Sequence, residues 1–174
     1  MPARISPGCG RRAPRPADRP LRSTRVTRLL PYAPDDLWRM VADVEAYPAF
    51  VPWVQSLRVW NRTAPKDGVS SLDAEAKVGF AMVRESFATR VRLDGARRTI
   101  DVGLLHGPFR RLRNHWEFLP SPDGTRIEFE IDFEFKSRLL DALLAANLHR
   151  AAEKLIGCFE ARAKALYGAA AGVA

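Results

Sequence analysis

The chain has 174 residues, of which 47% are hydrophobic and 28% charged, and its formal net charge is +8 at pH 7. This length and composition predict one globular domain that buries about two-thirds of its surface, which excludes an intrinsically disordered chain. No apolar run approaches the ~18 residues of a spanning helix, and the first segment lacks the apolar stretch of a secretory signal, so we expect neither a transmembrane nor a secreted protein.

Residues 1–22 are rich in arginine and proline, with six arginines against one aspartate. The five prolines disfavour helix and strand, so we predict a disordered tail that is either simply solvated or able to contact anionic lipid or RNA. The rest of the chain is nearly balanced in charge and gives no reason to expect DNA binding. Cys9 in this tail and Cys158 on an expected helix predict no disulfide framework and favour the cytoplasm.

A regular pattern begins with a predicted strand over residues 23–30, and Pro34 then opens a short amphipathic helix. The helix leads into residues 43–53, DVEAYPAFVPW, in which two prolines separate three aromatic residues. The prolines disfavour a long helix and bias the residues before them toward extended geometry, which predicts a stiff aromatic elbow. The elbow either plugs a corner of the core or gates an apolar cavity.

A series of strands separated by turn signals follows, as is typical of an antiparallel meander. The expected strands cover residues 55–62, 72–80, 85–93, 99–105, 109–119 and 126–135. The last alternates apolar and charged residues strictly, which indicates one packed and one solvated face. Its outward carboxylates, Glu128, Glu130, Asp132 and Glu134, are therefore interpreted as a solvated face and not as a catalytic cluster.

The last element expected is one long helix over residues 137–167, with Ser137 as its N-cap and Gly168 as its stop. Its apolar stripe contains Leu140, Leu144, Leu148, Leu155 and Phe159. A helix packed on the apolar face of a curved antiparallel sheet of about seven strands is an α+β fold, and it resembles the helix-grip fold. The expected divisions are a tail over 1–22, a ligand-binding domain over 23–168 and a flexible end over 169–174.

The motifs of catalysis and cofactor binding are missing from the sequence. Its three histidines lack metal-ligand spacing, and there is no nucleophile elbow, phosphate loop or dinucleotide-binding pattern, so we predict no catalytic residue, metal or cofactor. Two polar residues, Glu85 and Asn114, share the apolar face by parity. Each is either an internal hydrogen-bond partner or a strand-end residue in solvent, or else contacts the polar head of an apolar ligand.

The space between a curved sheet and its gripping helix is suited to an apolar ligand. The candidate cavity residues lie on the elbow, the inner face of the sheet and the long helix. They are Phe50, Val51, Trp53, Val78, Phe80, Glu85, Phe87, Val91, Phe109, Leu112, Asn114, Trp116, Phe118, Phe129, Ile131, Phe133, Leu140, Leu144 and Leu148. Simple core packing is the alternative interpretation of the aromatic residues.

Five segments together resemble the coenzyme Q-binding members of the START-like polyketide cyclase/dehydrase (SRPBCC) superfamily. They are DVEAYPAFVPW, AKVGFAMVRESFATRV, GPFRRLRNHWEF, IEFEIDFEFKSRLL and FEARAKALYG, in this order within residues 23–168. The resemblance implies a non-enzymatic protein that holds a polyprenylated quinone such as ubiquinone and supports respiration or quinone biosynthesis. The same family includes ribosome-association toxins, which implies a ribosome-binding regulator as the alternative. A cyclase or aromatase is a third possibility, for which only Glu85 could act as acid or base.

A quinone with a polyprenyl tail scarcely leaves the bilayer, because each exposed CH₂ costs about 0.8 kcal/mol. We therefore expect transient docking at the inner face of a membrane, through the leucines at the start of the long helix. Leu139 and Leu143 are the docking candidates, flanked by Arg138, His149 and Arg150 as possible headgroup contacts. The alternative is that these leucines belong to the core.

Overall fold

The computed structural model describes residues 22–80, 83–145 and 147–168, and the side chains of residues 80, 83 and 143–145 are not part of that description. The elements are, in chain order, β1 (Arg22–Leu30), α1 (Pro34–Ala42), the 3-10 helix η1 (Val44–Ala49), β2 (Val54–Trp60), β3 (Val69–Phe80), β4 (Val83–Asp94), β5 (Thr99–His106), β6 (Phe109–Ser121), β7 (Gly124–Phe135), α2 (Arg138–Ala145) and α3 (Leu148–Tyr167). The predicted tail 1–22, except Arg22, and the predicted end 169–174 fall outside the described residues.

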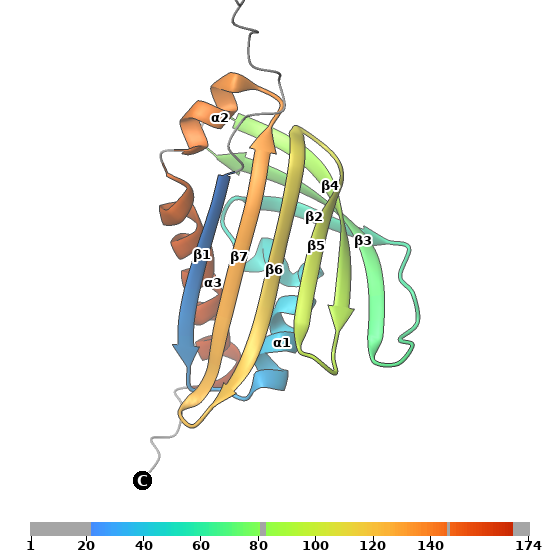
Figure 1. The fold of residues 1–174 in the computed structure, drawn as a ribbon, viewed down its shortest axis with the longest axis vertical. Helices are drawn as coiled ribbons and strands as arrows, with labels where there is room; N and C mark the ends of the chain where they lie inside the picture. Colours follow the sequence, from blue (N-terminus) through green and yellow to red (C-terminus); the bar gives the residue numbers. More distant parts are fainter. Residues whose placement is uncertain (1–21, 81–82, 146, 169–174) are drawn as a thin grey trace, which may run out of the picture.

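The seven strands form one curved antiparallel sheet in the order β1-β7-β6-β5-β4-β3-β2. Helices α1 and α3 cover its inner face, and α2 lies beside the end of β7 (Figure 1). The α+β helix-grip fold predicted from the sequence is confirmed. The strict alternation in β7 produces this arrangement, because its apolar side chains all point toward the helices.

The prediction of one helix over residues 137–167 is wrong, because two helices occupy that segment. Helix α2 ends at Ala145 and α3 begins at Leu148, with Asn147 between them at φ −124° and ψ 8°. Asparagine competes with helical hydrogen bonding, and here its carbonyl accepts the first bond of α3, from the N–H of Ala151 at 2.8 Å. The expected N-cap and stop are present, since the Leu140 N–H donates to Ser137 Oγ and Gly168 has φ +79°.

The elbow is also more regular than its prolines predicted. The chain from Val44 to Ala49 is a 3-10 helix that contains Pro48, and not an extended segment. Pro48 is tolerated in this short helix because the N–H groups near the start of a helix have no acceptor within it, so the N–H that proline lacks is not missed. The side chain of Tyr47 closes the turn back onto α1 by donating its hydroxyl to the Val41 carbonyl at 2.6 Å.

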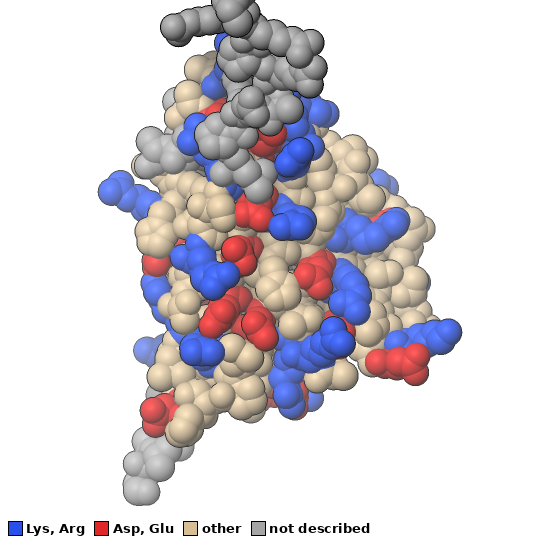
Figure 2. Space-filling model, viewed as in Figure 1, with Lys and Arg blue, Asp and Glu red and all other residues tan. Residues whose placement is uncertain are grey.

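The outer face of the sheet carries a ladder of ion pairs between neighbouring strands. Arg25 pairs with Glu130 and Arg113 with Asp132, at 3.2 and 3.3 Å, and Arg110 reaches Glu134 at 3.8 Å. Figure 2 shows positive and negative side chains interspersed over this face. Three of the four β7 carboxylates are therefore paired with arginines of neighbouring strands, and Glu128 pairs with Arg126 within β7, in agreement with the interpretation that they form the polar outer face.

Candidate functional site

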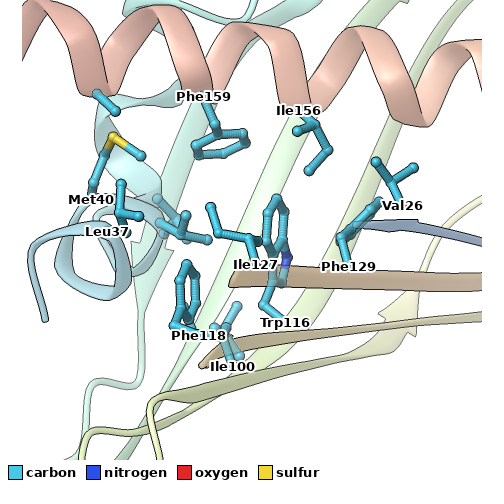
Figure 3. Packing of buried hydrophobic residues seen from close by; sticks show 14 of the residues in the cluster. Val26, Leu37, Met40, Ile100, Trp116, Phe118, Ile127, Phe129, Ile156 and Phe159 are labelled. Atoms are coloured by element: carbon cyan, nitrogen blue, oxygen red, sulfur yellow. The ribbon is translucent and has the colours of Figure 1, made fainter. Parts of the chain in front are cut away.

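The inner apolar side chains divide into two groups, and in the larger one most members are buried. This group, called the dense cluster, joins α1 and α3 to the sheet (Figure 3). Its buried members are Val26, Leu37, Met40, Val41, Val44, Leu72, Ala74, Val91, Ile100, Trp116, Phe118, Ile127, Phe129, Ala152, Ile156, Phe159 and Ala163. Half-buried residues pack around it: Leu30, Tyr32, Trp38, Ala42, Tyr47, Phe50, Leu57, Val59, Leu93, Val102, Ile131, which also contacts the second group, and Leu155. At its centre the Phe159 ring lies 5.1 to 5.2 Å from the rings of Tyr47, Phe50 and Trp116.

The second group, called the open cluster, lies toward α2 and is much less enclosed. Its buried members are Leu112, Phe133 and Phe135, and its half-buried members are Phe87, Leu104, Phe109, Ile131, Leu140 and Leu148. Phe109 is its centre, with ring centroids 5.3 Å from Phe87 and 4.5 Å from Phe135. The half-buried members therefore keep part of their surface accessible although they lie on the inner face.

The sheet itself is irregular beside the open cluster. Strands β5 and β6 pair from Thr99–Glu117 to Gly103–Arg113, and no described pair joins them beyond that point. Register shifts place an extra residue in β6 between Phe109 and Arg111, in β5 between Leu104 and His106, and in β2 between Val54 and Ser56. Bulges bend strands and re-aim side chains. The sheet therefore separates between β5 and β6 where the open cluster begins.

Asn114 lies at the base of this separation, on the inner face. It is the neighbour of Arg113 in the last β5–β6 pair, and its own cross-strand partners are Val102 and Ile131. Its side-chain oxygen is buried and has no hydrogen-bond partner among the described residues. Buried polar atoms are nearly always satisfied in proteins, so an orphaned acceptor facing apolar neighbours is a candidate ligand contact.

The structure brings together only part of the predicted cavity set. The dense cluster holds Val91, Trp116, Phe118 and Phe129 as buried core. The open cluster gathers Phe87, Phe109, Leu112, Ile131, Phe133, Leu140 and Leu148, with Asn114 at the seam. Half-buried Val78 and Glu85 pair with each other further along the sheet, and the side chains of Phe80 and Leu144 fall outside the described residues.

The elbow residues belong to the packed side of this division. Phe50 stacks edge-on against Phe159 and lies under the Arg162 guanidinium, which is 5.5 Å from the ring centre. Val51 is fully buried, and Trp53 is half-buried at the start of β2, where its carbonyl accepts the Gly79 N–H. Burial also raises the pKa of the Tyr47 hydroxyl above its ordinary value. The elbow is therefore packed against the dense cluster, as in the interpretation that it fills a corner of the core.

The structure describes the side chain of only one of the two residues proposed for membrane docking. Leu139, on α2, is 70% exposed, whereas the side chain of Leu143 lies outside the described residues. Arg22 of β1 holds α2 through Asp141, with 3.1 Å between the charged groups. His149 of α3 is bonded to Thr24 and approaches Glu153, so it serves the β1–α3 contact.

Sequence reasoning missed Leu104 and Phe135 in the open cluster, and also Val102, which lies opposite Asn114 and packs against the dense cluster. Their alternation within β5 and β7 was visible, and parity alone would have included them. No pattern in the sequence, however, indicated that the inner side chains divide into a dense and an open cluster. Within the described residues no group of acidic, His or Cys side chains is arranged to hold a metal ion, and no helix is long and apolar enough to cross a bilayer.

Residues 30–160 match the family model described as polyketide cyclase/dehydrase and lipid transport. The chain belongs to this family. A ribosome association toxin RatA of Rickettsia prowazekii is 34% identical over 82% of this chain and 96% of its own length. A mitochondrial coenzyme Q-binding protein coq10 of Schizosaccharomyces pombe is 36% identical over 70% of this chain and 74% of its own. The family resemblance deduced from the sequence is thereby confirmed.

Solved structures share this fold. The 18 kDa protein CC1736 of Caulobacter crescentus is 59% identical, with a TM-score of 0.72 over 84% of this chain and 99% of its own. The Zhui aromatase/cyclase of a Streptomyces species has a TM-score of 0.68 over 88% of this chain and 99% of its own, at 19% identity, which shows the fold alone. The two relatives matched by sequence, from Rickettsia prowazekii and Schizosaccharomyces pombe, are described as a toxin and as a coenzyme Q-binding protein.

Proposed function

We propose that this protein binds an isoprenoid quinone at the open cluster and does not transform it. The observation that carries the proposal is the partial exposure of inward-facing apolar side chains around Phe109, beside the separation of β5 and β6. Apolar side chains with one or two polar groups among them are typical of lipid sites. The coenzyme Q-binding relative supports quinone as the ligand class.

The proposal is tested by extracting the purified protein with organic solvent, analysing the extract by mass spectrometry and titrating the protein with a short-tailed ubiquinone. Leu104 and Leu57 provide a matched pair, because both are half-buried inner leucines, one in the open cluster and one against the dense cluster. We expect Leu104→Ala to weaken quinone binding several-fold and Leu57→Ala to leave it unchanged. Absence of any bound or added isoprenoid quinone would contradict the proposal.

Access to a ligand dissolved in a bilayer requires contact with the membrane, and we assign that contact to α2. Leu139 is 70% exposed on this helix, and Arg138 beside it is exposed as well. Leu166, at the far end of α3, is 47% exposed and serves as the control. We expect Leu139→Glu to reduce co-flotation with anionic liposomes and Leu166→Glu to leave it unchanged, with both variants folded. Equal loss in the two variants would remove α2 from the proposal.

A second candidate is binding to the ribosome, which the names of several relatives favour. The exposed side chains of Arg111 and Arg138 would contribute to it near α2. Binding to phosphates must weaken steeply with salt. Co-sedimentation with ribosomal subunits at low salt that is lost in Arg111→Glu, while quinone is not bound, would favour this function over the first.

A cyclase activity has one candidate group, Glu85, which is half-buried on the inner face opposite Val78. The proposed function assigns it no proton transfer. We therefore expect Glu85→Gln to bind quinone as the unmodified protein does. A large change in the ligand recovered from Glu85→Gln would support catalysis instead.

A further inference from the structure

The inner residues of β6 lie at successive depths beside the open cluster. Asn114 adjoins the dense cluster, since its cross-strand partners Val102 and Ile131 both pack against that cluster. Leu112 follows, and Phe109 lies farthest from it, where the strand begins. Because a strand rises about 3.3 Å per residue, roughly 15 Å separate the two ends of this stretch. The open cluster therefore has an inner end at Asn114 and an outer end at Phe109.

The inner end carries two polar side chains that form no hydrogen bond with a described residue. The side-chain oxygen of Asn114 is buried without a partner. Thr89 faces inward from β4, where it pairs with Ala74 of the dense cluster and Leu104 of the open cluster, and it is 7% exposed. An amide and a hydroxyl can each donate or accept, depending on how they are rotated. Together they can bond the carbonyl or the hydroxyl oxygens of a ligand, whichever way the amide is turned.

The spacing of these two groups matches a para-quinone ring. Thr89 and Asn114 are two strands and one step of two residues apart, which places their Cα atoms about 12 Å from each other. A ring with two opposite oxygens, each joined to a protein group by a hydrogen bond, spans about 11 Å. The dense cluster closes the space behind them, because Trp116 packs on Phe129 with the ring centroids 4.3 Å apart. A ring is therefore stopped at the inner end.

The outer end differs in chemistry, since mostly hydrocarbon lines it. Phe109 packs edge-on against Phe87 there, and Leu140 of α2 belongs to the same cluster. The polar residue at this end, Glu85, precedes Phe87 on β4 and is half-buried, so water still reaches it. These surroundings suit a polyprenyl chain better than a ring with two polar oxygens.

We infer that the quinone binds ring first, with its two oxygens bonded to Asn114 and Thr89 and its tail directed past Phe109 toward α2. The inference rests on the proposed function and adds the orientation of the ligand and the two residues that fix it. A ring and roughly two isoprene units fill a length of about 15 Å, so the rest of a long tail stays outside. Exposing that hydrocarbon to water is unfavourable, so it remains in the bilayer. The protein encloses the ring while the ligand's own tail tethers the complex to the membrane.

The orientation is tested with the purified full chain and two fluorescent analogues of a ubiquinone that has four isoprene units. One analogue carries the label at the tip of the tail, and the other carries it on the ring. We expect the tail-labelled analogue to bind as tightly as the unlabelled ubiquinone and the ring-labelled analogue at least tenfold more weakly. Equal binding of the two analogues, or tighter binding of the ring-labelled one, overturns the inference. Failure of every ligand to bind, the unlabelled ubiquinone included, overturns the proposed function.

Variants test the two residues that hold the ring. Asn114→Leu and Thr89→Val each remove a hydrogen-bonding group at similar side-chain volume, and each should weaken binding of the unlabelled ubiquinone roughly five- to tenfold. Glu85→Gln, at the outer end, is the control and should bind as the unmodified protein does. If Asn114→Leu fails to fold, Thr89→Val carries the comparison. Full affinity in the folded variants overturns the inference and leaves the proposed function in place.

The tether is tested by flotation of the full chain with liposomes that contain a ubiquinone of either ten or two isoprene units. The long-tailed ligand should stay in the floated fraction and hold more of the protein there than the short-tailed one does. Recovery of the long-tailed ubiquinone with the protein in the soluble fraction overturns the tether, because the whole tail has then left the bilayer.

Discussion

The two ends of the inner space are built from the same kinds of side chain and differ in how completely they are covered. In the dense cluster, α1, α3 and the elbow press aromatic and aliphatic groups together, and Phe159 is 1% exposed. In the open cluster, phenylalanines of equal size face inward from β4 and β6 and remain half-buried. Composition therefore does not distinguish core from candidate site.

Regularity of the backbone is what separates the two regions. Around the dense cluster the β6–β7 and β1–β7 pairs run without a shift. Around the open cluster the pairing of β5 with β6 ends, β5 and β6 carry bulges, and the helical layer changes from α3 to α2. Each interruption removes contacts that would otherwise fill the space. The dense cluster holds the fold together, and the interrupted end is the part of the inner face to which we assign the ligand in the proposed function.

The largest expected effect comes from emptying the dense cluster. Phe159→Ala removes a ring that contacts three other aromatic rings, and a buried Phe→Ala change costs about 3–5 kcal/mol of unfolding free energy. Phe87→Ala is the matched change in the open cluster, where the ring is half-buried. We expect it to cost about 1–2 kcal/mol, less than a fully buried ring, and to weaken quinone binding. Urea denaturation measures both, and equal losses would show that the two clusters are packed alike.

A smaller effect is expected at Tyr47, whose pKa is raised chiefly by burial and also by the charge of Asp43. Folding favours the neutral phenol, so this contribution to stability is complete below pH 10, the ordinary pKa, and declines as the pH rises above it. Tyr47→Phe removes the titrating group together with the 2.6 Å bond to Val41, at a cost of about 1 kcal/mol at pH 8. Its stability should then fall less steeply than that of the unmodified protein between pH 10 and 11.

Urea midpoints measured from pH 8 to 11 check this expectation. Tyr32→Phe is a suitable control at pH 8, since Tyr32 also donates to a backbone carbonyl, that of Gly168, at the surface. It should cost less than Tyr47→Phe. If Tyr47→Phe and the unmodified protein lose stability in parallel above pH 10, the Tyr47 hydroxyl is not enclosed as described.

The sequence predicted the sheet well because alternation is a direct consequence of strand geometry. Residues 126–135 alone identified which face of β7 is buried, and parity extended this to its neighbours. Parity says nothing of position along a strand, so Phe118 and Phe109 looked equivalent although one is core and the other half-exposed. Their difference depends on α1 and α2, which are far from them in sequence.

The helix break at Asn147 was hidden for a similar reason. Leu144 and Leu148 keep the i, i+4 spacing of a continuous stripe across it, and no proline or glycine lies between them. The bulges in β5 and β6, at Leu105 and Arg110, likewise coincide with ordinary residues. Asn114 was singled out together with Glu85, because a polar residue at a position that parity assigns to the apolar face is conspicuous in the sequence.

The smallest effect is expected at α2, which closes the open cluster and is tied to β1 by the Arg22–Asp141 pair. The pair is partly exposed, so Asp141→Asn should lower global stability by at most about 1 kcal/mol. Its consequence should be local, because α2 is short and covers half-buried side chains. We expect hydrogen exchange of the α2 amides to accelerate a few-fold and that of α3 to stay unchanged.

The chain offers a close control for this prediction. Asp36 also lies in the first turn of a helix and pairs with an arginine, Arg39, at 3.1 Å, but on α1 above the dense cluster. Asp36→Asn should leave α2 exchange as it is. Faster exchange in α2 with unchanged α3 would show that the cover of the open cluster moves independently of the helix that holds the dense one. Unchanged exchange in Asp141→Asn would instead show that the apolar contacts of Leu140 suffice to hold α2.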